Sequence, residues 1–516
     1  MRRLILILAF VSSTFFMGLA KEVTITILAT TDMHGNITGK DYTTGDKLGY
    51  GLVQAAPLIE TLRKTKENTI LVDCGDAFVG NPLTFYHHFH AIDEDDPVAT
   101  AMRMLKYNVA VPGNHDFDYG TNVLKQNISA TRFPWISANI QDKAGQPLFP
   151  ATLVIERAGI KIGFFGLTTP ATAHFETPAV LDGTQFLDMV ASAKKAVAEL
   201  KKQKVDIVVG LIHSGKGAKL QTGQMNENAV YQVTENVPGI DAIIYGHSHK
   251  EVGLEMYNGV LLCQPKDHVK SIGVLLVDLQ QRDGKWEILS KSSTTLQVND
   301  SEMDKKIEKK IRKLDKATKK FMDQDLGEYR HQLEFTEDPL APGTASYFIA
   351  DSMKSWKNSD IQFVTASNPG VRVKTKRATV VNSHVFELLP YDNYMAQISI
   401  KGTEIKALME HAASMLDSEG KLKPAYPFFQ FGFFIGADYS VHPNKPGGSR
   451  VEIRKIGDKP FQADGLYSMD LTTYLLGGGG GYFSNGNRPA ASAFSSDSLR
   501  NIMIAYIESL QKKDGD

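Results

Sequence analysis

Aspartate, histidine and asparagine side chains recur in small clusters along this chain, and together they have the chemistry of a metal site. On an extended segment, side chains two residues apart point the same way, which pairs Asp32 with His34 and His247 with His249. A mixed oxygen and nitrogen set favours zinc, manganese, iron or nickel over magnesium or calcium. Each cluster follows a short apolar run: residues 23–28 before Asp32 and His34, 69–72 before Asp76, 108–111 before Asn114 and His115, 207–212 before His213, and 241–245 before His247 and His249.

Two cations sharing one site is the arrangement that these residues favour. A carboxylate can bridge two cations, and Asp76 is the candidate because the preceding Gly75 allows close backbone approach. Asn114 adds a neutral amide oxygen, which leaves net positive charge in the site. Two such metals can clamp both oxygens of an in-line phosphoryl displacement and generate hydroxide near neutral pH. We therefore expect two divalent metal ions, zinc or manganese, as cofactors.

The apolar runs supply the elements that must position these side chains. They are short, rich in β-branched residues and bounded by Gly and Asp, which is typical of buried strands. In open α/β sheets the carboxyl ends of the strands line the ligand crevice, so the clusters are expected to converge. Between residues 21 and about 295 such runs alternate with helical stretches such as 190–204, which predicts an α/β layered domain.

A length of 516 residues favours two or more domains. The charged stretch 301–322 carries Ile307, Ile311, Leu314 and Phe321 at helical spacing and predicts an amphipathic linker helix lying on one domain; a fully solvated helix is the alternative. Beyond it, strand-like and helix-like segments come in mixed order, which favours an α+β domain. The predicted divisions are 21–300, 301–325 and 326–516, with strands at 361–364, 378–381 and 395–400 and helices at 344–356 and 402–415.

The N-terminus predicts export. Arg2 and Arg3 precede an apolar stretch over residues 4–19, and small residues follow, as in a secretory signal peptide cleaved after Ala20. A retained membrane anchor is the alternative. No other stretch is long and apolar enough to span a bilayer, so we expect a secreted or periplasmic protein without stable membrane insertion after cleavage. The formal net charge of −1 implies no polybasic surface for a nucleic acid polymer.

The remaining histidines and the two cysteines have more ordinary interpretations. A disulfide between Cys74 and Cys263 is compatible with an oxidising compartment, although a buried free thiol is favoured for Cys74. Several histidines lie outside the pattern of strand and cluster and are interpreted as surface or structural residues: His87, His88, His90, His174, His268 and His384.

The complete set of clusters resembles that of the calcineurin-like metallophosphoesterases. This resemblance implies a four-layer α-β-β-α domain. It also implies that one metal is held by Asp32, His34, Asp76 and His249, and the other by Asp76, Asn114, His213 and His247. The segment 113–118 resembles the 5'-nucleotidase branch, which implies a catalytic dyad of His115 and Asp118. His115 would stabilise the phosphoryl transition state or protonate the leaving oxygen, and Asp118 would orient it.

The second domain resembles the 5'-nucleotidase C-terminal domain, which selects the substrate. The resemblance implies that Asn114, Ser367, Asn368 and Arg372 contact the nucleotide and that Phe431 and Tyr474 stack on its base, since bases stack on rings and Arg binds phosphate or ribose oxygens. Without the resemblance, both rings would be interpreted as core aromatics. Residues 478–481 are four glycines where the family usually has Gly-Gly-Asp-Gly. Residues 389–393 and 436–439 are closer to 2',3'-cyclic-nucleotide phosphodiesterase/3'-nucleotidases.

The expected function is thus an exported, two-metal hydrolase that releases nucleoside and phosphate from small-molecule nucleotides by attack of a metal-bound hydroxide. It would act as a 5'-nucleotidase, as a 2',3'-cyclic-nucleotide 2'-phosphodiesterase/3'-nucleotidase, or as both. Two alternatives remain: the same metal site acting on nucleotide sugars or other phosphate esters, and an inactive binding protein of this fold.

Overall fold

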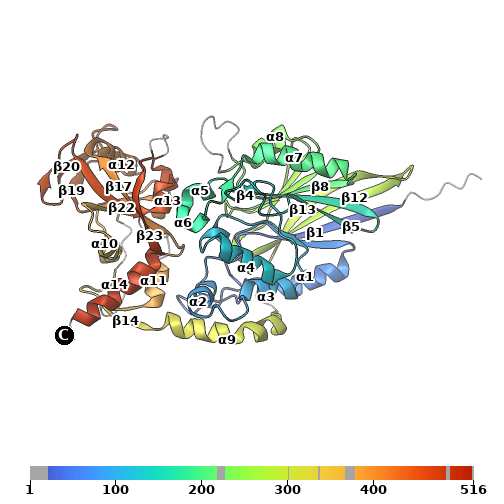
Figure 1. Ribbon diagram of the computed structural model, residues 1–516, viewed down its shortest axis with the longest axis horizontal. Helices are drawn as coiled ribbons and strands as arrows, with labels where there is room; N and C mark the ends of the chain where they lie inside the picture. The colour runs from blue at the N-terminus through green and yellow to red at the C-terminus, as the bar shows by residue number, and fades with distance from the viewer. Residues whose placement is uncertain are drawn as a thin grey trace, which may run out of the picture.

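The computed structural model describes residues 21–217, 227–299, 302–334, 338–365, 378–483 and 488–513. The N-terminal part, from blue to green in Figure 1, contains two sheets, and the C-terminal part, from orange to red, lies beside it. The helix α9 (Lys305–Met322) runs along one side of the N-terminal part and ends beneath the C-terminal part (Figure 1). The predicted class, an α/β domain followed by a linker helix and an α+β domain, is confirmed.

The N-terminal part is built on two sheets. The first has the order β13-β12-β1-β2-β3, with bounds Glu22–Thr30 (β1), Thr69–Asp73 (β2), Val109–Ala110 (β3), Ser271–Arg282 (β12) and Lys285–Gln297 (β13). The second has the order β10-β11-β9-β8-β6-β5, with bounds Thr152–Arg157 (β5), Ile160–Thr168 (β6), Ile207–His213 (β8), Ala242–Tyr245 (β9), Val252–Tyr257 (β10) and Val260–Gln264 (β11). All five apolar runs predicted as strands belong to these sheets. Because β1, β2 and β3 run parallel, as do β6, β8 and β9, their carboxyl ends meet at one edge of each sheet.

Helices cover the outer faces of both sheets and give the four layers that the resemblance implied. Between the sheets lies a core of mostly aliphatic side chains that includes Ile27, Val72 and Leu211. Outside the first sheet pack α1 (Leu52–Thr65), α2 (Pro82–His90), α3 (Pro97–Met104), α4 (Thr121–Thr131) and α9. Outside the second pack α7 (Met189–Lys202) and α8 (Val230–Asn236). Shorter elements are α5 (Thr172–Phe175), α6 (Pro178–Leu181), β4 (Ile140–Gln141), β7 (Gln185–Phe186) and the 3-10 turns His115–Phe117 and Asp267–Val269.

The linker helix α9 buries the stripe that its periodicity predicted. Asp304 caps its N-terminus by accepting hydrogen bonds from the backbone N–H groups of Lys306 and Ile307. The apolar stripe lies in the core outside the first sheet, and each side chain contributes roughly 1.5–3 kcal/mol by burial: Ile307, Ile311, Leu314 and Phe321. The helix therefore lies on the N-terminal part, as predicted, and is not fully solvated.

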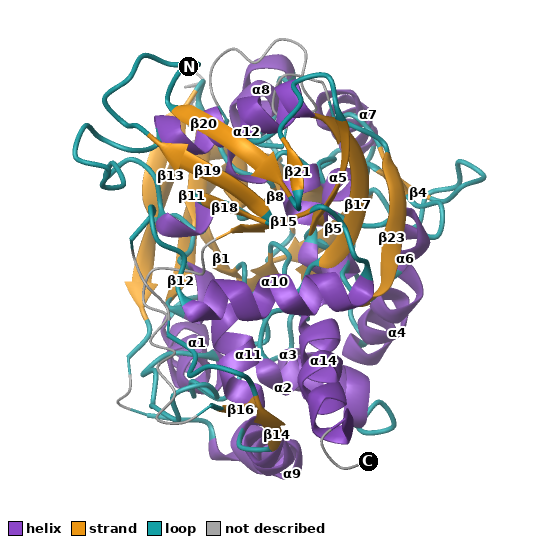
Figure 2. Cartoon of the chain, turned by 90° about the vertical axis from the view of Figure 1, so that its left-hand side faces the viewer, coloured by secondary structure: helices purple, strands orange, loops and turns teal. Residues whose placement is uncertain are grey.

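The C-terminal part is an α+β unit. Its main sheet has the order β18-β15-β22-β17-β23, with bounds Ile361–Thr365 (β15), Tyr394–Lys401 (β17), Gly432–Ile435 (β18), Leu466–Thr472 (β22) and Ala491–Ser498 (β23). Smaller sheets join β14 (Asp325–Glu328) to β16 (Thr379–Val381), and β19 (Ala437–Val441) through β20 (Val451–Ile456) to β21 (Lys459–Pro460). Figure 2 shows α10 running across the view below the strands of this sheet, with α11 and α14 below it. The helices are α10 (Thr344–Trp356), α11 (Asn382–Leu388), α12 (Gly402–Ser414), α13 (Thr473–Leu476) and α14 (Leu499–Lys513), with 3-10 turns at Phe428–Gln430 and Gly479–Gly481.

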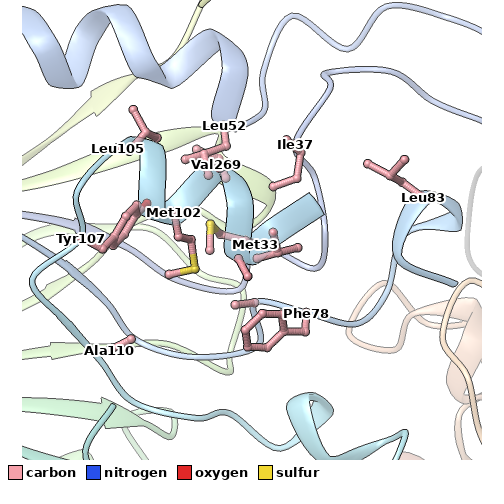
Figure 3. Packing of buried hydrophobic residues seen from close by; sticks show 14 of the residues in the cluster. Met33, Ile37, Leu52, Phe78, Leu83, Met102, Leu105, Tyr107, Ala110 and Val269 are labelled. Atoms are coloured by element: carbon pink, nitrogen blue, oxygen red, sulfur yellow. The ribbon is translucent and has the colours of Figure 1, made fainter. Parts of the chain in front are cut away.

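Hydrophobic anchors fix the loops that follow β1 and β2. Met33 lies between Asp32 and His34 and is fully buried, and Phe78 lies two residues after Asp76 and is almost fully buried. Figure 3 shows both side chains within one apolar cluster, near Met102. Phe78 also stacks on Trp135 with ring centroids 5.3 Å apart. Asp32, His34 and Asp76 therefore each lie within two residues of a side chain packed in the core, which limits how far these loops can move.

Three further predictions are settled or set aside here. Cys74 and Cys263 are both buried free thiols, so there is no disulfide between them. Among the described residues, no helix is long and apolar enough to cross a membrane. The predicted signal peptide, residues 1–20, lies outside the described residues and stays a prediction.

Candidate metal centre

Two groups of potential metal ligands lie side by side at the carboxyl ends of the strands. Asp32, His34 and His249 form one group, and Asp76, His213 and His247 form the other; within each group the ligand atoms lie within 4.8 Å of one another. The same atom, Asp76 Oδ2, lies 3.8 Å from His34 Nε2 and 3.0 Å from His213 Nε2. One carboxylate oxygen thus faces both groups.

The imidazole rings are oriented by hydrogen bonds to backbone carbonyls. His34 Nδ1 lies 2.9 Å from Val79 O, and His213 Nδ1 lies 2.6 Å from Cys74 O. A carbonyl oxygen only accepts, so each Nδ1 carries a proton, and Nε2 is the ring atom that each histidine directs toward the other potential ligands. His34 Nε2 lies 3.0 Å from His249 Nε2. Two such nitrogens at this distance repel one another unless a proton or a cation lies between them, so the donor set fits a bound metal.

The protonation states of the two groups differ. Burial lowers the pKa of His34 well below its ordinary value, so that ring is neutral, as a metal ligand must be. Burial also opposes charge on His213, but Asp76 outweighs it and raises the pKa of His213 to about 9. Although burial favours its neutral form, His213 and His115 hold the pKa of Asp76 well below its usual range. Asp76 is therefore ionised, and a divalent cation would displace the proton of His213.

The backbone around these side chains is strained. Asp32, His34, Asp76, His247 and His249 all have positive φ, between 47° and 72°. Left-handed backbone is uncommon for residues other than glycine and clusters at functional sites. The expectation that Asp32–His34 and His247–His249 present paired ligands on extended backbone is therefore wrong in its geometry. Asp32 and His34 do join one group, but His247 and His249 are divided between the two, because turns rather than strands carry them.

Small residues allow the two loops on either side of Asp76 to approach. A Cβ on Gly113 would lie 2.1 Å from Asp76 Oδ1, and one on Gly75 would lie 2.5 Å from the backbone nitrogen of Gly113.

Asp116, which the sequence did not single out, joins the same loops. Its carboxylate accepts hydrogen bonds of 2.8–3.0 Å from the backbone N–H groups of Gly113, Asp76, Ala77 and Phe78. Its place within the segment 113–118 was the only signal for this role.

Asn114 and the predicted dyad stand at the same place. Asn114 Oδ1 lies 3.2 Å from His213 Nε2, within the second group. His115 Nδ1 lies 3.0 Å from Asp118 Oδ2, and the rings of His115 and His34 are 5.4 Å apart. Burial opposes charge on His115, yet Asp118 and Asp76 raise its pKa to about 10. His115 is thus protonated at neutral pH and directed by Asp118.

The structure describes only some of the predicted substrate-binding residues. Ser367, Asn368 and Arg372 lie outside the described residues. Phe431 is only 3% exposed and packs edge-on against Phe433 in the core of the C-terminal part. Tyr474 is half-buried at the junction of the two parts, 6.4 Å between ring centroids from Phe175. Base stacking by Phe431 and Tyr474 stays a prediction.

Several residues near the site were not predicted from the sequence or were predicted to have only a structural role. Tyr391 stacks on His115, and His268, expected to be a surface or structural residue, lies 5.5 Å from His34 and 5.8 Å from His249 between ring centroids. Glu176 is buried near Asp118, and burial raises its pKa well above the ordinary value. Three of the other histidines outside the pattern make structural contacts: His87 with Asp96, His174 with Arg488 and His384 with Val381.

Comparisons with known proteins agree with this architecture. Residues 25–251 match the family described as calcineurin-like phosphoesterase, and residues 325–485 match the family described as 5'-nucleotidase, C-terminal domain. The chain is 26% identical to a 2',3'-cyclic-nucleotide 2'-phosphodiesterase/3'-nucleotidase of Yersinia enterocolitica, over 96% of this chain and 87% of that protein. It is 24% identical to the trifunctional nucleotide phosphoesterase protein YfkN of Bacillus subtilis, over 90% of this chain, but spans only 36% of that longer protein.

The solved structures show the same fold. The crystal structure of a 5'-nucleotidase precursor from Thermus thermophilus superimposes with a TM-score of 0.66, covering 95% of this chain and 97% of that one at 23% identity. Both parts of the chain, and not the metal centre alone, therefore have counterparts in one known architecture.

Proposed function

This chain belongs to the calcineurin-like phosphoesterases that carry a 5'-nucleotidase C-terminal domain, and from that membership we propose an exported, two-metal nucleotide phosphoesterase. As a member of the family it is a metal-dependent hydrolase of phosphoric esters. Residues 21–300 would form the catalytic domain, 301–325 the linker and 326–516 the domain that selects the substrate.

The position of Asp76 is the observation that carries the proposal. Its Oδ2 faces His34 on one side and His213 on the other, and its Oδ1 accepts the backbone N–H of His115 at 2.8 Å. A single carboxylate placed between these two groups of potential ligands suits two cations. Asp32, His34, Asp76 and His249 would hold one, and Asp76, Asn114, His213 and His247 the other; the mixed donor set favours zinc or manganese.

When bound, such a pair of metals polarises the phosphoryl group and supplies a nucleophile near neutral pH. Residues of the chain would donate the proton, orient the donor and contact the phosphoryl group. His115 is protonated, so it can donate a proton to the leaving oxygen or hydrogen-bond the phosphoryl oxygens as charge develops. Asp118 accepts from His115 Nδ1, which directs the Nε2–H toward the substrate and stabilises the charged ring. Asn114 would contact the phosphoryl group as well as the second metal.

Nucleotides are the proposed substrates. Relatives that match nearly the whole chain are named for activity on cyclic nucleotides and 3'-nucleotides or on 5'-nucleotides, which supports nucleotides as the substrate class. The proposal therefore includes phosphate esters at the 3' and at the 5' position of the ribose. Phe431 and Tyr474 would stack on the base, and Ser367, Asn368 and Arg372 would bind the ribose or phosphate. The products would be a nucleoside and inorganic phosphate.

A substrate panel with and without a chelator tests the proposal. Release of inorganic phosphate, 3'-AMP, nucleoside monophosphate or p-nitrophenol is measured from 5'-AMP, 3'-AMP, 2',3'-cyclic AMP, a nucleotide sugar and p-nitrophenyl phosphate, before and after metal removal and after zinc or manganese is restored. We expect release from at least one nucleotide that the chelator abolishes and the metal restores. Release from the sugar nucleotide or the simple ester alone would move the chain to the second substrate class, and no release from any compound would favour a binding protein.

Export has a separate test. Cleavage after Ala20 predicts that mass spectrometry of the protein recovered from outside the cytoplasm finds Lys21 as its first residue. An intact Met1 or Arg2 in that material would reject cleavage and support the retained anchor.

A further inference from the structure

We propose that Tyr391, from the C-terminal part of the chain, is a positioning residue of the catalytic site that holds the imidazole of His115. This inference rests on the proposed function, because it assigns His115 the role described above. It adds that the C-terminal part contributes to the chemical step itself as well as to the choice of substrate.

The two rings are offset and roughly parallel. Tyr391 stacks on His115 with centroids 5.5 Å apart and planes 21° apart, and it lies edge-on to His34 at 5.7 Å. It also lies 6.4 Å from His249. A hydrogen bond from Nδ1 to Asp118 fixes one edge of the imidazole but leaves the ring able to tilt about that bond. A flat ring packed on its face removes this freedom, and aromatic pairs favour such offset stacking.

Tyr391 is itself held firmly by its neighbours in the chain. Arg500 Nη2, on α14, donates to Leu389 O at 2.6 Å, and Arg500 Nη1 lies 3.3 Å from Asp392 Oδ2. The backbone N–H of Leu499 donates to Asn393 O at 2.7 Å. Arg500 and Asp392 are both buried, so this ion pair is shielded from solvent. The segment 389–393 is therefore fixed on both sides of Tyr391.

The same segment is also fastened to the N-terminal part. Tyr394 Oη donates to the backbone carbonyl of Asp118 at 3.0 Å, so the dyad is contacted from the C-terminal part at Asp118 as well as at His115. The Arg500 guanidinium lies 4.2 Å from the ring centroid of Phe386 and 5.2 Å from that of Phe85 on α2. These contacts join α14, α11 and α2 across the junction, and they make the placement of Tyr391 a property of how the two parts dock.

This role predicts a defect that does not depend on the base. If Tyr391 acted only in substrate selection, its loss would change KM for nucleotides and leave a simple ester unaffected. If it holds His115, its loss lowers kcat on every substrate, because misplacing a catalytic group by about 1 Å can cost on the order of 100-fold.

The test compares Tyr391→Ala, Tyr391→Leu and Tyr391→Phe on p-nitrophenyl phosphate and on the best nucleotide, with bound metal measured in each. We expect kcat to fall about 10- to 100-fold in the Ala and Leu variants on both substrates, with KM changed less than about threefold and metal content unchanged. The Phe variant keeps the flat ring and should stay within about threefold of the wild-type kcat. Tyr347→Ala, an exposed tyrosine on α10, is the matched control and should behave as wild type.

The outcomes separate this inference from the function on which it rests. If the wild-type protein hydrolyses neither substrate, the proposed function fails. If the wild type is active and Tyr391→Ala and Tyr391→Leu keep its kcat, the positioning role is wrong. Equal losses in the Phe and Ala variants would also overturn it, since they would assign the effect to the hydroxyl. A melting curve on each variant identifies any loss caused by unfolding, and the Leu variant preserves apolar bulk if the Ala variant is unstable.

Discussion

Replacing Asp76 by asparagine tests the two-metal centre at its midpoint. Asp76 is 1% exposed, and its two oxygens have separate tasks: Oδ1 accepts the His115 N–H, and Oδ2 faces His34 and His213. In Asp76→Asn the amide can keep its oxygen on the His115 N–H, which turns an NH₂ group toward both groups of ligands. The reverse orientation leaves the His115 N–H facing another donor. Neither orientation serves both tasks.

The expected loss follows from the removal of a buried charge. Taking away one partner of a buried charge pair costs about 3–5 kcal/mol. Applied to the metals, this corresponds to roughly a hundred- to a few-thousand-fold weaker metal binding. Because Asp76 belongs to both groups, both metals should be affected together. We expect purified Asp76→Asn to lose most of its bound metal on dialysis and most of its phosphate release.

The assay is elemental analysis of the dialysed protein together with turnover of a nucleotide. Asp470→Asn is the matched control, because Asp470 is also a fully buried aspartate but lies on β22, in the C-terminal part. It should retain both metals. Normal metal content and normal turnover in Asp76→Asn would refute the bridging role, and loss of one metal with the other retained would restrict Asp76 to a single group.

Three further predictions concern the dyad, the two aromatic rings of the C-terminal part and a buried aspartate outside the site. His115→Ala should keep both metals and lose roughly 10²–10⁴ in turnover, the range of a general acid or base; loss of metal would make His115 a ligand. Phe431→Ala and Tyr474→Ala should each lower kcat/KM for nucleotides about ten- to a hundredfold, from roughly 1–3 kcal/mol of stacking, with little change on p-nitrophenyl phosphate; equal losses on both would make these rings core residues. Burial raises the pKa of Asp470 from 3.8 to about 6, so the folded state holds this proton more tightly and stability falls as pH rises across that interval. Asp470→Asn should then stabilise the protein by about 1–3 kcal/mol at pH 8, measured as a higher calorimetric melting temperature, and change the melting temperature little at pH 4.

The positions of the strands and the neighbourhood of the site are written in local patterns of the sequence. Residues 207–212 are apolar on both faces, and residues 23–28 carry only two threonines among apolar side chains; such runs are typical of buried strands, and both belong to the paired sheets. Ile307, Ile311 and Leu314 repeat at helical spacing and so had to face a core. Because parallel strands end at one edge, the clusters at 32–34 and at 213 were bound to lie near each other once the sheets formed.

Backbone geometry divides those side chains between the two groups. His247 and His249 belong to different groups, as the family resemblance implied, because positive φ at both residues turns the chain between them; their spacing in the sequence had predicted a pair on one extended segment. Asp116 joins two loops through four backbone N–H groups, which carry no side-chain signature in the sequence.

The docking of the two parts of the chain was equally beyond the sequence. Tyr394 and Asp118 are 276 positions apart, and their contact depends on how whole domains pack. The resemblance of residues 389–393 to the related phosphodiesterases does not indicate the imidazole on which the ring of Tyr391 lies. Phe431 shows the same limit: one aromatic residue in an apolar segment fits a core and a stacking site equally well, and burial by its neighbours is decided only when the segment is folded. Strand and helix periodicity is a local property of the chain, whereas ligand grouping and ring stacking arise from contacts between segments distant in sequence.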